Sequence, residues 1–292
     1  MPSLGLIYRS LNEDDFKVLR AMERLSKRRE LIPLEDIVRE TRLYEEKVSL
    51  VLYKLHRLKL VKSALTGSSR SFRLTYQALD MLALKSLVDQ NIVSAIGDKV
   101  GVGKESDLYK AMSPSGEVLV IKFLRIGRSS FRRTKLLRSW AQSPTTTWFE
   151  QSKAAAEREF KALVDLYSNK ANVPRPYGFN RHATVMEFID GVELFRRPAL
   201  RDPLKVLEQI FETLRIAYSK VGIVHGDLSE YNIVVSKNEE RPYIIDWPQF
   251  VYKEEPNALP LLSRDVKYIL RFFGKVYGVG GDPDEVVRYI TT

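Results

Sequence analysis

The chain has 292 residues, of which 44% are hydrophobic, enough for two domains that each bury a core. It contains no cysteine, which excludes disulfides and thiolate metal sites, and no apolar run is long enough to span a membrane. The N-terminal residues show no basic segment followed by an apolar core, so we expect no secretion signal and a cytoplasmic protein. A formal net charge of +10 favours contact with a polyanion.

Residues 1–92 show a helical pattern that ends in strand-like segments. Apolar positions recur at helical spacing in three stretches after the expected capping residue Asn12, the third of them at residues 44–58. A hairpin at residues 62–73 and a helix at residues 75–90 complete the unit. Two helices joined by a short turn and followed by a hairpin resemble a winged helix-turn-helix. In that family the third stretch is the recognition helix and the hairpin is the wing.

This unit is rich in basic side chains suited to phosphate contacts. Glu45 and Glu46 lie among them, which leaves open the alternative that the unit docks a protein. We expect nucleic acid, in particular structured RNA, bound through its backbone more than through its bases. The predicted phosphate contacts are Arg42, Lys47, Lys54, Arg57, Lys59, Lys62, Arg70 and Arg73.

A glycine-rich stretch at residues 97–110 has the composition of a phosphate-binding loop. It is not a Walker A motif, because Asp98 stands where that motif needs glycine and Glu105 stands where it needs serine or threonine. Two strands joined by a turn follow, and the second, at residues 118–123, carries a lysine. This order is that of protein kinases. The predicted nucleotide contacts here are Gly101, Val102, Gly103, Lys104, Glu105, Ser106 and Lys122, the last on the α- and β-phosphates.

Seven basic residues and no acidic one lie between Val118 and Phe149. The serines, threonines and glycine of this stretch indicate a phosphorylatable loop, and its charge favours RNA contact. Ser129 or Ser130 is the predicted autophosphorylation site. A solvated insertion without a role is the alternative.

A helix predicted at residues 152–167 should supply the carboxylate that pairs with Lys122. The two candidates, Glu157 and Glu159, lie about 160° apart around a helix. Glu157 faces Lys161 one turn later, on the solvent side, whereas Glu159 lies beside the buried stripe. Glu159 is therefore the expected partner.

A strand predicted at residues 184–190 runs into a turn and matches the hinge between the two lobes of a kinase. Adenine would hydrogen-bond to backbone groups of Glu187 and Ile189, with Met186 behind the ring. A plain strand that ends in a turn is the alternative.

Residues 225–247 place two carboxylates and a carboxamide on loops at one end of a predicted hairpin. Asp227 and Asn232 precede one apolar strand, and Asp246 ends the next. Magnesium takes oxygen ligands, and one or two carboxylates plus substrate phosphates usually suffice to bind it. We therefore expect ATP together with Mg²⁺ or Mn²⁺ at this end of the hairpin.

Taken together, these motifs are similar to those of the RIO kinases, a family of atypical serine/threonine protein kinases. The winged helix and the sequence Gly-Lys-Glu-Ser-Asp at residues 103–107 point to the second branch of the family. The resemblance implies an α+β fold in which a bilobal kinase-like domain at residues 93–292 follows the winged helix. Its β-rich lobe would span residues 93–187, and a trimmed helical lobe would span residues 190–292.

The resemblance also implies an activity and a partner. The activity would be ATP hydrolysis or autophosphorylation coupled to maturation of the small ribosomal subunit, with a phosphoryl group possible on Asp246 itself. The partner would be the pre-ribosomal subunit and its RNA, and we expect a monomer away from the ribosome. The roles implied are Asp227 as catalytic aspartate, Lys122 and Glu159 as its catalytic partners, and Asn232 and Asp246 as metal ligands.

Several positions depart from ordinary protein kinases. Gly226 replaces the arginine of the catalytic loop, Ser229 replaces a phosphate-neutralising lysine, and Trp247 follows the metal-loop aspartate. The short segment after Asp246 carries no Ala-Pro-Glu motif, so a diffusible peptide substrate is not expected. Asp265 resembles the helix aspartate that braces the catalytic loop, with an ordinary acid at a helix start as the alternative.

Two other functions remain open from the sequence. One is a small-molecule phosphotransferase of the aminoglycoside or choline kinase type, which shares the His-Gly-Asp, Asn and Ile-Asp-Trp pattern. The segment at residues 191–224 leaves little room for the helical insertion that such enzymes need. The other is a winged-helix RNA-binding scaffold with a vestigial nucleotide site.

Overall fold

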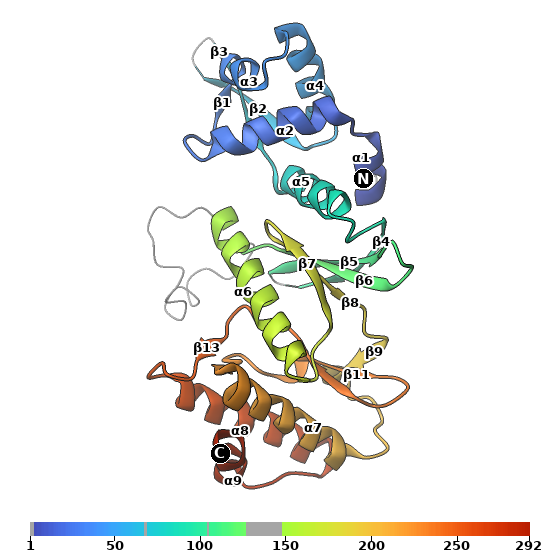
Figure 1. Cartoon of the computed structure of the whole chain (residues 1–292), viewed down its shortest axis with the longest axis vertical. Helices are drawn as coiled ribbons and strands as arrows, with labels where there is room; N and C mark the ends of the chain where they lie inside the picture. Colours follow the sequence, from blue (N-terminus) through green and yellow to red (C-terminus); the bar gives the residue numbers. More distant parts are fainter. Residues whose placement is uncertain (1–2, 67–68, 104, 127–147) are drawn as a thin grey trace.

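The computed structural model describes residues 3–66, 69–103, 105–126 and 148–292. A winged-helix unit, a five-stranded sheet with a long helix against it, and a helical lobe follow one another along the long axis of the molecule (Figure 1). The expected α+β architecture with two kinase-like lobes is confirmed. None of the helices in these ranges is long and apolar enough to cross a membrane.

The winged-helix unit follows the predicted order. The Asn12 side chain accepts a hydrogen bond from the Asp15 N–H, and the Asp15 carboxylate accepts one from the Asn12 N–H, which closes a capping box. The first helix is an addition to the prediction, because seven residues are too few to show a helical period. The elements are α1 (Leu4–Ser10), α2 (Glu13–Ser26), β1 (Ile32–Pro33), α3 (Leu34–Thr41), α4 (Glu45–Arg57), β2 (Val61–Thr66), β3 (Ser69–Leu74) and α5 (Tyr76–Asp89).

The N-lobe sheet is antiparallel and has the strand order β4-β5-β6-β8-β7. In the central strand, Leu119, Ile121 and Phe123 point into the core shared with the winged helix. Side chains alternate along a strand, so Lys122 points to the opposite face, where α6 lies. The elements are β4 (Ala95–Val102), β5 (Ser106–Met112), β6 (Val118–Leu124), α6 (Trp148–Ser168), β7 (Pro176–Asn180) and β8 (Ala183–Glu187).

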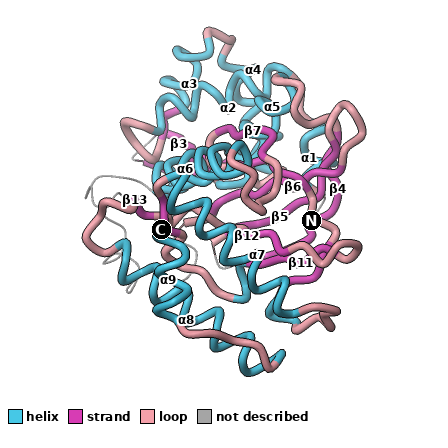
Figure 2. Tube along the Cα trace, turned by 60° about the horizontal axis from the view of Figure 1, so that its bottom comes forward, coloured by secondary structure: helices cyan, strands magenta, loops and turns pink. Residues whose placement is uncertain are grey.

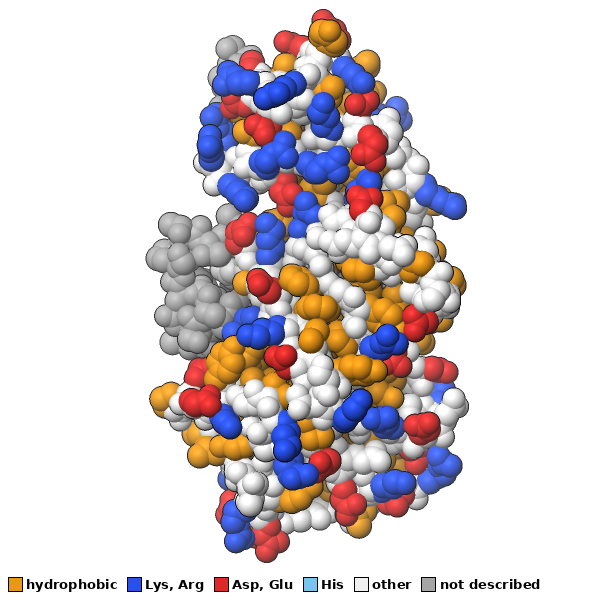
Figure 3. Space-filling view, viewed as in Figure 1, with side chains coloured by type: hydrophobic (Ala, Val, Ile, Leu, Met, Phe, Trp, Pro, Cys, Tyr) orange, Lys and Arg blue, Asp and Glu red, His pale blue; other side chains and the backbone are white. Residues whose placement is uncertain are grey.

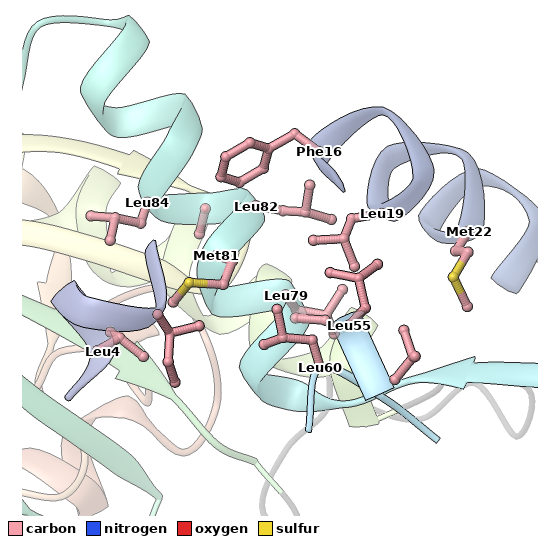
Figure 4. Close-up of a cluster of buried hydrophobic side chains, with 14 of the residues drawn as sticks. Leu4, Phe16, Leu19, Met22, Leu55, Leu60, Leu79, Met81, Leu82 and Leu84 are labelled. Carbon is pink, nitrogen blue, oxygen red and sulfur yellow. The ribbon is translucent and has the colours of Figure 1, made fainter. Parts of the chain in front are cut away.

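A single hydrophobic core joins the winged helix to this sheet. Every residue of α5 from 78 to 84 is buried, as expected for a helix enclosed on all sides. Met81 points toward Leu4 of α1, while Leu82 points toward Leu19 of α2 (Figure 4). Because the core is continuous across residue 92, the boundary between the two predicted domains stays a prediction.

The C-lobe combines three helices with short strands. β11 pairs with β12 in the predicted hairpin, with Ile233 opposite Ile244, and this hairpin lies beside α7 (Figure 2). The elements are β9 (Gly191–Glu193), η3 (Leu194–Arg196), α7 (Pro203–Ile216), η4 (Ala217–Val221), β10 (Ile223–Val224), η5 (Glu230–Asn232), β11 (Ile233–Ser236), β12 (Pro242–Ile244), β13 (Val251–Tyr252), α8 (Ala258–Tyr277) and α9 (Pro283–Thr291).

The shared core predicts that the winged helix and the N-lobe unfold together. Leu82→Ala removes a fully buried side chain from α5 and should lower the free energy of unfolding by about 2–5 kcal/mol. Hydrogen exchange in denaturant should show α2 and β6 losing protection at the same concentration. Leu50→Ala, at a side chain that is 71% exposed on α4, is the control and should change stability by less than about 0.5 kcal/mol. Separate transitions for α2 and β6 would contradict a common core.

Candidate active site

The β11–β12 hairpin brings the predicted catalytic and metal-loop residues to one end. Asn232 immediately precedes β11, and its backbone carbonyl accepts a hydrogen bond of 2.9 Å from the Ile245 N–H, next to Asp246. The Asn232 amide group donates to the Asp227 carbonyl oxygen at 2.9 Å. These two bonds join the loop of Asp227 to the loop of Asp246, so the structure gathers the three side chains as the sequence predicts.

The loop that carries Asp227 is braced by α8. The Gly226 N–H donates to the Asp265 carboxylate at 2.9 Å, and Arg264 donates to the Gly226 carbonyl at 2.5 Å. Gly226 has a φ of 76°, in the left-handed region that favours glycine. Asp265 is buried well inside α8, which begins at Ala258, so the alternative of an acid at a helix start is wrong. Sequence reasoning missed Arg264, whose contact depends on tertiary packing.

Trp247 anchors the loop that carries Asp246. Its side chain is fully buried, and the centroid of its ring lies 4.6 Å from the centroid of the His225 ring. Its indole N–H donates to the Ile244 carbonyl at 3.1 Å. A phenylalanine at this position cannot make that hydrogen bond. Asp246 itself has a φ of 68°, which is unfavourable for a residue other than glycine. A strained backbone residue thus lies directly before a fully buried tryptophan.

Lys122 connects the two lobes. Its ammonium group contacts the Glu159 carboxylate of α6 and lies 2.7 Å from Asp246 Oδ1 of the C-lobe. Glu159 also accepts from the Thr184 hydroxyl at 3.2 Å, a contact that sequence reasoning missed. Burial alone would lower the pKa of Lys122, but Asp246 and Glu159 outweigh it and raise the pKa above its ordinary value. Of the two candidate glutamates, Glu159 forms the ion pair.

Asp227 is exposed to solvent, yet the surrounding protein desolvates it in part. This desolvation raises the pKa of Asp227 above its ordinary value, and the nearby Asp246 charge adds to the effect. His225 and Arg264 act in the opposite direction. A carboxylate with a raised pKa accepts protons more readily, which suits a general base.

The glycine-rich loop is the tight connection between β4 and β5. The Gly103 N–H donates to the Ser106 carbonyl at 2.8 Å, and a Cβ on Gly103 would lie only 3.0 Å from the Ser106 hydroxyl oxygen. A Cβ on Gly101 would lie 3.2 Å from a Leu108 methyl group. Glycines here allow the backbone to approach closely. Lys104 and the Val102 side chain lie outside the described residues, as do Ser129 and Ser130.

The predicted hinge is partly occupied by protein contacts. The Glu187 N–H already donates to the Arg175 carbonyl at 2.8 Å, so this donor is not available to adenine. A contact of adenine with Glu187 would therefore use the backbone carbonyl, and the adenine contacts expected at Glu187 and Ile189 stay a prediction. Met186 is buried and packs in the C-lobe core, and Ile189 is half-buried just beyond β8.

The predicted nucleic-acid contacts fall into two groups. Lys47 lies 2.7 Å from Asp14, Lys54 lies 2.5 Å from the buried Asp15, and Arg73 lies 2.5 Å from Glu30, so these three are neutralised within the unit. Figure 3 shows Lys and Arg side chains interspersed with Asp and Glu over the winged-helix unit, at the top of the view. Of the predicted set, only Lys54 is half-buried, and the exposed members outside these three ion pairs are Arg42, Arg57, Lys59, Lys62 and Arg70.

Comparison with known proteins agrees with this geometry. A family model described as RIO domain matches residues 107–286, and one described as Rio2, N-terminal matches residues 8–90. The chain belongs to the RIO kinase family, in its Rio2 branch. The expected family and enzyme class, serine/threonine protein kinase, are confirmed, and a small-molecule phosphotransferase is not supported.

The Rio2 relatives cover most of the chain. The RIO-type serine/threonine-protein kinase Rio2 of Methanocaldococcus jannaschii is 37% identical over 273 residues, which cover 90% of this chain and 98% of that protein. The serine/threonine-protein kinase rio2 of Schizosaccharomyces pombe is 33% identical over 94% of this chain and 79% of its own length. A solved structure, the Rio2 kinase-ADP/Mg2+-phosphoaspartate complex from Chaetomium thermophilum, is similar with a TM-score of 0.82 at 30% identity. It covers 98% of this chain and 88% of that one.

The buried position of Lys122 predicts a large loss of stability when its charge is removed. Lys122→Met leaves Glu159 buried and without its cation, which should cost about 3–5 kcal/mol of unfolding free energy. Lys153→Met is the matched control on α6, since Lys153 pairs with Glu150 at the surface and should contribute less than about 1 kcal/mol. Chemical denaturation measures both, and equal losses would contradict a buried ion pair.

The raised pKa of Asp227 predicts the acidic limb of the pH profile. A general base must be unprotonated, so ATP turnover should fall as the pH drops through this raised pKa. The pH at which the rate falls should therefore lie above the ordinary aspartate pKa of about 3.9. Initial rates across the pH range, with circular dichroism to confirm folding at each pH, test this. A limb at or below the ordinary value would contradict the assignment.

Proposed function

We propose that the chain is an ATP- and magnesium-dependent atypical serine/threonine kinase and ATPase that acts on itself during maturation of the small ribosomal subunit. The observation that carries the proposal is the contact of Lys122, from the N-lobe sheet, with Asp246, from the C-lobe loop. This contact supports one centre in which the lysine would bind the phosphates and the aspartate would bind the metal. The solved Rio2 kinase relative is a complex with ADP and Mg2+.

The side chains present fit a hard cation. The Asn232 amide nitrogen is engaged with the Asp227 carbonyl, so its oxygen is the atom directed elsewhere. Together with the Asp246 carboxylate, this oxygen would hold Mg²⁺, with Mn²⁺ as the alternative, and substrate phosphates would complete the ligand set. When bound, the metal neutralises charge on the transferring phosphoryl group. Lys122 would bind the α- and β-phosphates, and Asp227 would orient and deprotonate a nucleophile that carries a proton, such as the water that hydrolyses an acyl phosphate or a serine hydroxyl.

Asp246 is the acceptor that the site favours. Its side chain is 46% exposed, held beside Lys122 in a strained backbone conformation. In the proposed step a carboxylate oxygen of Asp246 attacks the γ-phosphorus, the bond to the bridging oxygen of ADP breaks, and water later hydrolyses the acyl phosphate. The solved Rio2 complex contains a phosphoaspartate. Autophosphorylation at Ser129 or Ser130 is a second candidate, on the ground of their place in a basic stretch.

The pre-ribosomal RNA is the partner we propose for the winged helix, with the protein acting as a monomer in the cytoplasm away from the ribosome. A net charge of +10 and the exposed cations of this unit support it. Lys47, Lys54 and Arg73 are set aside as primary contacts because carboxylates already neutralise them.

Turnover of ATP tests the catalytic proposal. Asp227→Ala should lower the rate by about 10²–10⁴, because a positioned base contributes that much. Asp246→Ala should abolish magnesium-dependent turnover. Glu285→Ala, at an exposed carboxylate on α9, is the control and should leave the rate unchanged. Unchanged turnover in both aspartate variants would leave only an RNA-binding scaffold with a vestigial nucleotide site.

Salt dependence tests the RNA proposal. The logarithm of RNA affinity should fall linearly with the logarithm of salt concentration. Arg57→Ala and Arg70→Ala should each reduce the slope by about 0.7–0.9, because each substitution removes one cation from a phosphate. Lys47→Ala, which removes a cation already paired with Asp14, is the matched control and should change the slope little. A flat dependence in the unaltered chain would contradict binding through phosphates.

A further inference from the structure

A buried charge network joins the winged helix to the phosphate loop through Arg125. This residue follows β6 and is 5% exposed. Its two terminal nitrogens donate to both carboxylate oxygens of Asp80 in α5, at 2.8 and 2.7 Å, and its Nε donates to Asp107 of β5 at 3.1 Å. Paired, parallel hydrogen bonds from arginine to a carboxylate are strong and fix orientation. The guanidinium therefore connects two elements that belong to different units.

Two further basic groups lie beside this pair among the residues that the structure describes. His182 Nε2 lies 2.8 Å from Asp80 Oδ1, and burial lowers the pKa of His182, so the neutral ring donates to Asp80. Lys99 of β4 lies 2.7 Å from Asp107. Two carboxylates thus face one guanidinium and one ammonium, with a neutral imidazole beside them.

The same network holds both sides of the glycine-rich loop. The backbone N–H of Arg125 donates to the backbone carbonyl of Glu105, a residue of the loop itself, at 2.6 Å. Asp107 lies just beyond the loop, where β5 begins, and it is bound by Arg125 on one oxygen and by Lys99 of β4 on the other. The strand before the loop and the strand after it are consequently tied to Arg125, and Arg125 is tied to α5.

A second bridge shows that docking of the winged helix does not depend on this network alone. Arg181, in the turn between β7 and β8, donates to both oxygens of Glu23 in α2 at 2.7 Å. It also donates to the Leu82 carbonyl and to the Ser86 hydroxyl of α5. Both bridges cross the same boundary, but these contacts of Arg181 are with α2 and α5, whereas those of Arg125 include Glu105 and Asp107.

We propose that Asp80 of the winged helix is a positioning residue for nucleotide binding, acting through Arg125 on the loop at residues 101–106. Without the Asp80 charge the guanidinium loses its paired partner and is free to shift toward Asp107. Asp107, at the start of β5, shifts with the guanidinium, so the loop that precedes Asp107 no longer keeps its binding geometry. Binding then has to order the loop first, which weakens affinity. By linkage, bound nucleotide strengthens this contact with α5 by the same factor.

The inference rests on the proposed nucleotide site, and one pair of variants of the full chain separates the two. Asp80→Asn keeps the shape and removes the charge, and it should raise the Kd for ADP with Mg²⁺ by roughly tenfold, within the usual range of coupling between sites. Glu23→Gln weakens the other bridge of the same boundary. It should lower the Tm by a similar amount. The Kd should stay within about twofold of the unaltered chain, because Glu23 pairs with Arg181 and not with Arg125. Titration calorimetry and thermal unfolding measure both quantities.

Hydrogen exchange without nucleotide supplies a readout that loss of stability alone does not move. Amides at residues 101–106 should exchange faster in Asp80→Asn than in Glu23→Gln, when both are compared at the same interval below their Tm. If Asp80→Asn does not fold, Arg125→Lys is the second variant, since lysine keeps the charge and loses the fork. It should raise the Kd in the same direction.

Three results distinguish the claims. A Kd that rises only in the Asp80 or Arg125 variant supports the inference. A Kd that is unchanged in that variant, or raised equally by Glu23→Gln, overturns the inference and leaves the nucleotide site standing. Failure of the unaltered chain to bind ADP with Mg²⁺ overturns the proposed function, and the inference with it.

Discussion

The ion pair of Lys122 with Glu159 is the interaction on which the rest of the centre depends. A lysine buried in a sheet keeps its charge only because carboxylates surround it, and Asp246 of the other lobe is one of them. The alternation of β6 explains why this is possible. One face of the strand closes the core shared with the winged helix, and the other presents a single cation toward α6 and the C-lobe. The residue that we propose for phosphate binding is therefore also one on which stability depends.

The C-lobe holds its part of the centre by backbone contacts more than by charge. Asp265 and Arg264 of α8 fix Gly226, and the buried Trp247 fixes the loop of Asp246. The two departures from ordinary protein kinases, Gly226 and Trp247, thus each take part in the contacts that hold these loops.

Local sequence patterns made much of the fold and of the candidate site predictable. Helical spacing separated Glu159 from Glu157, and the strand–turn–strand pattern placed Asp246 at the end of a hairpin. Contacts between distant residues left no such signal. Arg125 and Asp80 are far apart in the chain, and nothing in the local sequence indicates that Lys54 is neutralised by Asp15. The sequence therefore shows how many basic residues there are but not which of them are paired with carboxylates, since charge pairing is decided by tertiary packing.

The central claim is that the Lys122–Asp246 centre transfers phosphoryl groups within the chain. Acid quenching of the protein after reaction with ATP labelled at the γ-phosphate, followed by treatment with hydroxylamine, tests it most directly. An acyl phosphate on Asp246 predicts label that hydroxylamine releases and that is absent from Asp246→Asn. Label that resists hydroxylamine, or that persists in Asp246→Asn, would contradict the account.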